Sequence, residues 1–120
     1  MPHILIVDDE HQVRFLLSHS FARAGYDVTL AATVPEAMAF CKEKTFNVVL
    51  SDVDMPGMNG HELARWMASN HPKTLCVLMS GISSECEECP FVGRCILLRK
   101  PFDPKHGVAL ITEMLSGRQT

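Results

Sequence analysis

The stretch VVLSDVDMPGMNG, residues 48–60, joins an apolar run to an acidic turn. The apolar residues 48–50 predict a buried strand, and Asp52 and Asp54 follow it closely. The proline and glycines after them mark a turn. Carboxylates at the end of a buried strand are costly to hold unless something binds them. The stretch therefore predicts a strand that delivers a binding or reactive carboxylate to its carboxyl end.

The length and composition point to one globular domain, which we expect to span residues 1–120. Hydrophobic residues make up 47% of the chain and charged residues 21%, a balance typical of a folded protein. The net charge is −3 and the basic residues are scattered, so we expect no direct binding of nucleic acid. The apolar runs are too short to span a bilayer and no signal peptide is evident, so we expect a cytoplasmic protein without a membrane segment.

Short apolar runs alternate with helical patterns along the whole chain. The expected strands are residues 4–7, 28–31, 46–51, 75–79 and 96–99. The expected helices are residues 10–24, one that starts after the capping-box pair Thr33 and Glu36, residues 60–70, and one that starts at Pro104. A weaker fifth pattern covers residues 82–95. Strands that alternate with helices predict the α/β class, with a five-stranded parallel sheet covered on both faces.

Polar and charged residues gather where four of these strands end. They are Asp8 and Asp9 after the first strand, Asp52 after the third, Ser80 after the fourth and Lys100 after the fifth. In an open α/β sheet, ligands bind outside the carboxyl ends of the strands. Three carboxylates in one place repel one another, and Mg²⁺ suits such a site because it binds a few carboxylates together with water and a phosphate oxygen. With an ammonium and a hydroxyl nearby, the set predicts a phosphoryl-binding site with a carboxylate nucleophile.

Each of these features has a purely structural explanation when it is taken alone. A double aspartate after a strand often caps a helix, and a Ser-Gly or a Lys-Pro pair often belongs to a turn or loop. The joint placement of the residues at four strand ends favours a functional site over four unrelated turns.

Four segments strongly resemble the receiver domain of two-component response regulators, which include the CheY-like proteins. They are ILIVDDE (4–10), VVLSDVDMPGMNG (48–60), LMSG (78–81) and KPF (100–102). The resemblance implies a doubly wound, flavodoxin-like fold with strand order 2-1-3-4-5. It also implies a phosphorelay switch in which Asp52 accepts a phosphoryl group from a partner histidine kinase or phosphotransfer protein. Ser80 and Lys100 would bind that group, and slow self-dephosphorylation would reset the switch.

The resemblance also implies how the metal is held. Asp9 would bind Mg²⁺ or Mn²⁺ directly, together with Asp52 and the backbone carbonyl of Asp54, and Asp8 would act mainly through water. Receivers of this kind catalyse only their own phosphorylation and dephosphorylation, so we do not expect an enzyme in the wider sense. A homodimer that forms on phosphorylation is compatible with the resemblance.

Two features depart from the family pattern. Leu97 stands where the family often has an aromatic residue that reports the state of the switch. The family places its fourth helix at residues 82–95, but Pro90 should stop a helix there. We therefore expect a shortened or disrupted fourth helix and an unusual output face.

Two other functions stay open on the sequence alone. The DVDMP segment is also similar to the motif of haloacid-dehalogenase-type phosphatases, with Asp52 as nucleophile and Asp54 as general acid/base, although those enzymes usually need a longer chain. The second is a metal- or redox-sensing module at Cys86, Cys89 and Cys95. Three ligands underspecify a zinc site, so thiols that fill gaps around a short helix are the favoured interpretation.

Overall fold

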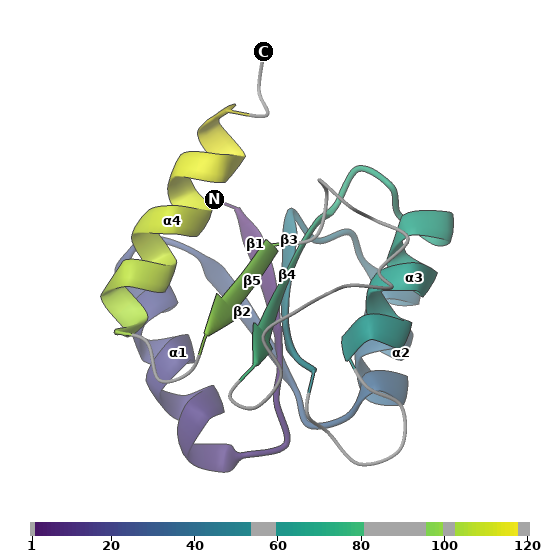
Figure 1. Cartoon of the computed structure of the whole chain (residues 1–120), viewed down its shortest axis with the longest axis horizontal. Coiled ribbons are helices and arrows are strands. Elements are labelled where there is room, and N and C mark those ends of the chain that lie inside the picture. Colours follow the sequence, from purple (N-terminus) through teal and green to yellow (C-terminus); the bar gives the residue numbers. More distant parts are fainter. Residues whose placement is uncertain (1, 54–59, 81–95, 100–102, 118–120) are drawn as a thin grey trace.

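The computed structural model describes residues 2–53, 60–80, 96–99 and 103–117 (Figure 1). The strands are β1 (His3–Val7), β2 (Asp27–Ala31), β3 (Val48–Asp52), β4 (Leu75–Ser80) and β5 (Ile96–Arg99). The helices within these ranges are α1 (His11–Arg23), α2 (Val34–Glu43), α3 (Gly60–Asn70) and α4 (Pro104–Gly117). None of these helices is long and apolar enough to cross a membrane.

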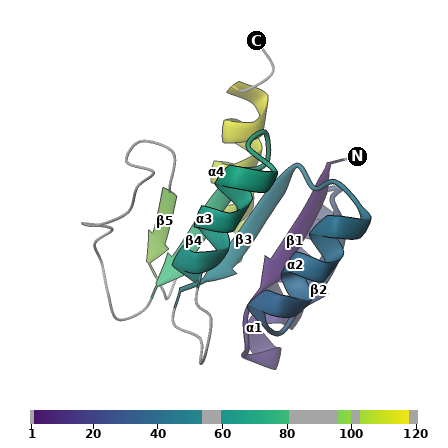
Figure 2. The same cartoon turned by 90° about the vertical axis from the view of Figure 1, so that its right-hand side faces the viewer.

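The strands form one parallel sheet in the order β2-β1-β3-β4-β5. Helices α1 and α4 cover one face of the sheet, and α2 and α3 cover the other, as Figures 1 and 2 show together. The predicted flavodoxin-like α/β fold with a parallel sheet is therefore confirmed. The helix expected to be short, within residues 82–95, lies outside the described residues.

Strand β3 lies at the centre of the sheet and every one of its residues is buried. Successive side chains of a strand point to opposite faces. Accordingly, Val48 and Leu50 pack in the core beneath α1 and α4, while Val49 packs in the core beneath α2 and α3. A strand buried on both faces needs a continuous apolar run, which explains why residues 48–50 are apolar without alternation.

The chain turns between helices and strands at positions with specific local chemistry. Gly25 adopts a φ of 97°, in the left-handed region that glycine tolerates best, and this lets α1 end and β2 begin. At the start of α2, the Thr33 hydroxyl accepts a hydrogen bond from the Glu36 N–H at 3.2 Å. The Glu36 carboxylate in turn accepts one from the Ala32 N–H at 3.4 Å. This exchange confirms the capping pair that the sequence predicts.

Candidate functional site

Asp8 and Asp52 occupy neighbouring positions at the carboxyl edge of the sheet. Strands β1 and β3 are parallel neighbours, and Val7 pairs with Ser51. The next position along both strands therefore places Asp8 beside Asp52. Adjacent strands lie about 5 Å apart, so the two residues are close enough to act on one bound group. The hydrogen bond from the Asp8 N–H to the Ala31 carbonyl, at 3.1 Å, ties Asp8 to β2 on its other side.

Both of these carboxylates are buried. Asp8 is 0% exposed and Asp52 is 2% exposed, whereas Asp9 and Glu10 are exposed. Among the residues that the structure describes, Asp8 and Asp52 are the charged side chains in the buried class. Taking a carboxylate out of water costs several kcal/mol, of order 5, unless charge and hydrogen bonds compensate it. Burying two such groups side by side is costly, and this cost favours a functional role for Asp8 and Asp52.

Asp8, Asp9 and Glu10 form a cluster of oxygen ligands. One carboxylate oxygen from each of them lies within 4.8 Å of the others. Hard divalent cations such as Mg²⁺ prefer carboxylate oxygens, and usually take only one or two of them together with water. The buried Asp8 of this cluster lies next to Asp52, and the set fits these preferences. Asp8 and Asp9 are residues that could hold such a cation.

The backbone and side chain of Asp8 both accept hydrogen bonds from residues that follow it. Its Oδ1 accepts one, at 2.9 Å, from the N–H of Glu10, the residue just before α1. Its carbonyl accepts a hydrogen bond from Arg14 Nη1 at 2.6 Å. The sequence reasoning missed Arg14. The available signal was a cation in the first turns of the helix that follows a pair of aspartates.

Of the remaining predicted site residues, the structure describes only the backbone of Ser80. Ser80 is the last residue of β4, where it pairs with Arg99 of β5. Its neighbour Met79 pairs with Asp52, so the backbone of Ser80 lies one position from the strand partner of Asp52. The structure does not describe the side chain of Ser80. Asp54, Lys100, Cys86, Cys89 and Cys95 lie outside the described residues, and their roles stay predictions.

The thiol of Cys41 packs in the core and is poorly suited to nucleophilic attack or metal binding. Cys41 is 4% exposed and its thiol donates a hydrogen bond to Met67 Sδ at 3.7 Å. Burial raises the pKa of the Cys41 thiol from 9.0 to about 11. Desolvation disfavours the thiolate, which is the form that attacks disulfides and binds metals. Cys41 is therefore a packing residue between α2 and α3.

Comparisons with known proteins agree on one family. The model of the response regulator receiver domain matches residues 4–112. The DNA-binding transcriptional regulator NtrC of Salmonella typhimurium is 32% identical over 118 residues, which are 97% of this chain and 25% of that protein. The aerobic respiration control protein ArcA of Escherichia coli K12 is 32% identical over 117 residues, 96% of this chain and 49% of that protein. The chain thus spans a quarter to a half of the length of these relatives.

Solved structures agree with the sequence matches. The CheY-like receiver domain protein of Methanospirillum hungatei JF-1 superposes with a TM-score of 0.92 at 27% identity, covering 99% of this chain and 97% of the other. The chemotaxis response regulator CheY4 of Vibrio cholerae superposes with a TM-score of 0.84 at 32% identity, covering 96% and 98%. Both similarities extend over nearly the whole of each chain.

Proposed function

The chain belongs to the response regulator receiver domain family, and we propose that Asp52 is the phosphoryl acceptor of this phosphorelay switch. The observation that carries the proposal is the position of Asp52. It is a buried carboxylate at the end of the central strand, next to Asp8 and the acidic cluster that begins there. No other carboxylate of the described residues combines burial with the end of β3.

In this proposal the acidic side chains have two roles, metal binding and attack on phosphorus. Asp9 would hold a Mg²⁺ or Mn²⁺ ion directly, together with Asp52 and the backbone carbonyl of Asp54, and Asp8 would act on the ion mainly through water. When bound, the cation neutralises part of the charge on the transferring phosphoryl group. A carboxylate oxygen of Asp52 forms the new bond to phosphorus, and the bond between phosphorus and the donor's imidazole nitrogen breaks with its electron pair left on the nitrogen. On the family resemblance, Ser80 and Lys100 bind the oxygens of that group.

We further propose that the phosphodonor is a histidine kinase or a phosphotransfer protein in the cytoplasm, and that the domain catalyses only its own phosphorylation and dephosphorylation. Relatives such as NtrC are named as DNA-binding regulators, but this chain spans only a quarter of that protein. The DNA contacts of such relatives are therefore no part of this proposal. A homodimer of the phosphorylated chain stays a prediction that sedimentation would test.

The two alternative functions find no support in the comparisons. The phosphatase hypothesis shares Asp52 as the nucleophile, but the family match over residues 4–112 is to receiver domains. The metal- or redox-sensing hypothesis rests on Cys86, Cys89 and Cys95, which lie outside the described residues. Neither gains an observation from the site.

Phosphorylation by a small donor tests the acceptor. With Mg²⁺ and acetyl phosphate, intact-mass measurement should find one base-labile phosphoryl group on the parent protein and none on Asp52→Asn. The matched control is Asp27→Asn, because Asp27 is an exposed aspartate at the start of β2, on the opposite edge of the sheet. The control should be phosphorylated as fully as the parent. Equal phosphorylation of Asp52→Asn would overturn the assignment.

A further inference from the structure

Strand β2 forms one edge of the sheet and β5 forms the other (Figure 2). Parallel strands bond through alternate residues, so half of the backbone groups of an edge strand have no partner within the sheet. The Asp27 N–H donates to the Pro2 carbonyl at 2.9 Å, which shows that alternate residues of β2, starting at Asp27, face β1. The N–H and C=O groups of Val28 and Leu30 therefore point away from the sheet.

This edge lacks the features that commonly protect an edge strand from pairing with a second chain. Such features include lysine or proline on the strand, a bulge, or a short length. Residues 28–31, Val-Thr-Leu-Ala, contain no charge and no proline, and they pair with β1 in unbroken register. The charged residue of the strand is Asp27, at its first position, and its carboxylate lies 3.1 Å from His3 Nδ1. The remainder of β2 is thus open to strand pairing.

Exposed apolar side chains lie beside this edge. Among the residues that the structure describes, the large apolar side chains in the exposed class are Phe15, Leu16 and Leu30, with 60%, 55% and 36% of their surface exposed. The first two lie on α1, which packs against β2. Val28 packs against the core beneath α1 and α4, and Leu30, two positions later, points to the same face. Apolar groups gathered on one part of a surface favour a contact with another protein.

The edge is complementary to a second copy of itself. In an antiparallel pair with its two-fold axis at Thr29, Val28 lies opposite Leu30 of the second copy, and Leu30 lies opposite Val28. Residues at such positions exchange N–H···O=C bonds, so this register uses the outward groups of both residues in both copies. A register shifted by two residues puts one of these positions opposite a residue outside β2. Asp27 lies opposite Ala31 of the second copy, so the two aspartates do not face each other.

We propose that β2 is a homodimer interface. The β2 strands of two copies pair antiparallel about Thr29 and join the two sheets into one. Val28 and Leu30 of each copy then pack against their counterparts across the two-fold axis, on the face that α1 covers. The contact involves one short strand, so the dimer is weak and depends on protein concentration.

This interface does not depend on the phosphoryl acceptor. Asp52 lies on β3, and β1 separates that strand from β2. The proposed dimer therefore forms without phosphorylation, and differs in this respect from the homodimer of the phosphorylated chain mentioned above.

Sedimentation equilibrium of the unphosphorylated chain tests the proposal. Between about 10 μM and about 1 mM, a range suited to a weak contact, the parent should show an equilibrium of monomer and dimer. Leu30→Lys places a charge in the contact from each copy and should weaken dimerisation about tenfold or more. Ala109→Lys adds the same charge at an exposed position of α4 and should dimerise like the parent. A parent that stays monomeric, or a Leu30→Lys variant that dimerises like the parent, would overturn the proposal.

Amide hydrogen exchange of the parent tests the register without any substitution. At about 1 mM protein, the amides of Val28 and Leu30 should exchange about threefold more slowly than in dilute solution, because they gain partners in the dimer. The Thr29 amide faces β1 in the monomer already and should change little. Asp52→Asn should give the same pattern, so failure of this proposal is distinct from failure of the acceptor assignment. Dimerisation without protection at Val28 and Leu30 would place the contact on another surface and contradict the proposal.

Discussion

The carboxylate and the carbonyl of Asp8 are both held by hydrogen bonds from residues that follow it, Glu10 just before α1 and Arg14 within it. Its carboxylate accepts from the Glu10 N–H and its carbonyl accepts from Arg14. Such contacts behind a metal-binding carboxylate fix its orientation and commonly change metal affinity about tenfold or more when they are removed. If the proposed metal site forms beside Asp8, we expect Arg14 to act on it through Asp8, without contacting the metal itself.

Replacement of Arg14 tests this positioning role. Arg14→Met keeps a long side chain but removes the donor to the Asp8 carbonyl, and should weaken Mg²⁺ binding roughly tenfold in a calorimetric titration. Arg14→Lys should restore part of the affinity because it can still donate. Arg65→Met removes an exposed arginine from α3 and should leave Mg²⁺ affinity unchanged. Parent-like affinity in Arg14→Met would show that Asp8 needs no such support.

The buried thiol of Cys41 predicts a specific dependence of stability on pH. Its pKa is about 11 in the folded chain and 9.0 when exposed, because burial disfavours the thiolate. The folded state therefore holds the proton more tightly, and this contribution is complete below pH 9 and is lost as the pH rises to 11. Two pH units correspond to about 2–3 kcal/mol at most.

Urea denaturation between pH 8 and 11 measures this contribution, since other groups also titrate in this range. The free energy of unfolding of the parent should fall more steeply than that of Cys41→Ala, although the variant starts lower because it has lost packing against Met67. Parallel curves for the two proteins would show that the thiol titrates normally in the fold.

At the scale of the element, local chemistry decides where α2 begins. Thr33 has extended backbone angles, φ −140° and ψ 161°, and its hydroxyl satisfies the Glu36 N–H. Early N–H groups of a helix have no partner within the helix, so a side-chain acceptor at this position stabilises the first turn. Val34 and Ala37, just inside, then enter the core beneath α2 and α3.

Substitution of the N-cap residue Thr33 should lower the free energy of unfolding by an amount typical of helix caps. Thr33→Ala should lower the free energy of unfolding by about 1 kcal/mol, because the Glu36 N–H loses its acceptor. Thr33→Ser keeps the hydroxyl and should stay within a few tenths of the parent, about 0.3 kcal/mol. Both are measured by urea denaturation at neutral pH. A loss of equal size in the two variants would assign the effect to the threonine methyl group instead.

At the scale of the whole molecule, packing and a hydrogen bond connect α4 to the first half of the chain. It packs with α1 over the core that contains Phe21 and Ile111, and the Tyr26 hydroxyl bonds to Thr112, 86 positions later. Tyr26 is 5% exposed, so this bond is formed at the border of the core. It links the turn between α1 and β2 to a helix that starts after the last strand.

A double-mutant cycle measures this link. Tyr26→Phe and Thr112→Val each remove one hydroxyl, and each should lower the free energy of unfolding by about 1 kcal/mol. The double variant should lose less than the sum, with a coupling energy of about 1 kcal/mol between the two positions. Thr29→Val, on the neighbouring strand β2, serves as the second position in a control cycle with Tyr26→Phe. Strict additivity in the Tyr26–Thr112 cycle would mean that the bond contributes nothing.

Sequence alone was sufficient for the fold class, and it named the residues of the candidate site, whose roles stay predictions. The alternation of strand and helix patterns predicts the α/β class, and the strand-end carboxylates single out Asp8, Asp9 and Asp52. These signals are local, because periodicity and the residue that follows an apolar run depend on only a few neighbouring positions. Strand boundaries were predicted less well: residues 46–51 were expected to form the third strand, and β3 is Val48–Asp52.

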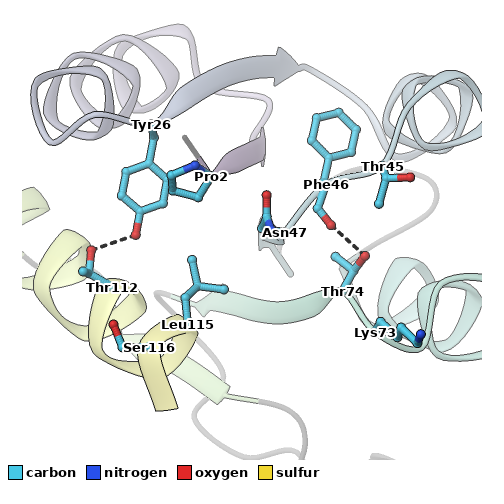
Figure 3. A pocket seen from close by; sticks show the side chains of 10 residues that line it. All are labelled: Pro2, Tyr26, Thr45, Phe46, Asn47, Lys73, Thr74, Thr112, Leu115 and Ser116. Atoms are coloured by element: carbon cyan, nitrogen blue, oxygen red, sulfur yellow. Dashed lines mark hydrogen bonds between the residues drawn. The ribbon is translucent and has the colours of Figure 1, made fainter. Parts of the chain in front are cut away.

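Other features were decided by the tertiary structure. The pairing of Val7 with Ser51 places Asp8 beside Asp52, and the fold brings Arg14 onto the Asp8 carbonyl and Tyr26 onto Thr112. A cleft at the amino-terminal edge of the sheet, too, exists only because five separate parts of the chain meet there, at Pro2, Tyr26, residues 45–47, residues 73–74 and residues 112–116 (Figure 3). Strand register, burial and contact between distant side chains depend on which segments pack together. The packing of segments depends on residues throughout the core, so no short stretch of sequence specifies it.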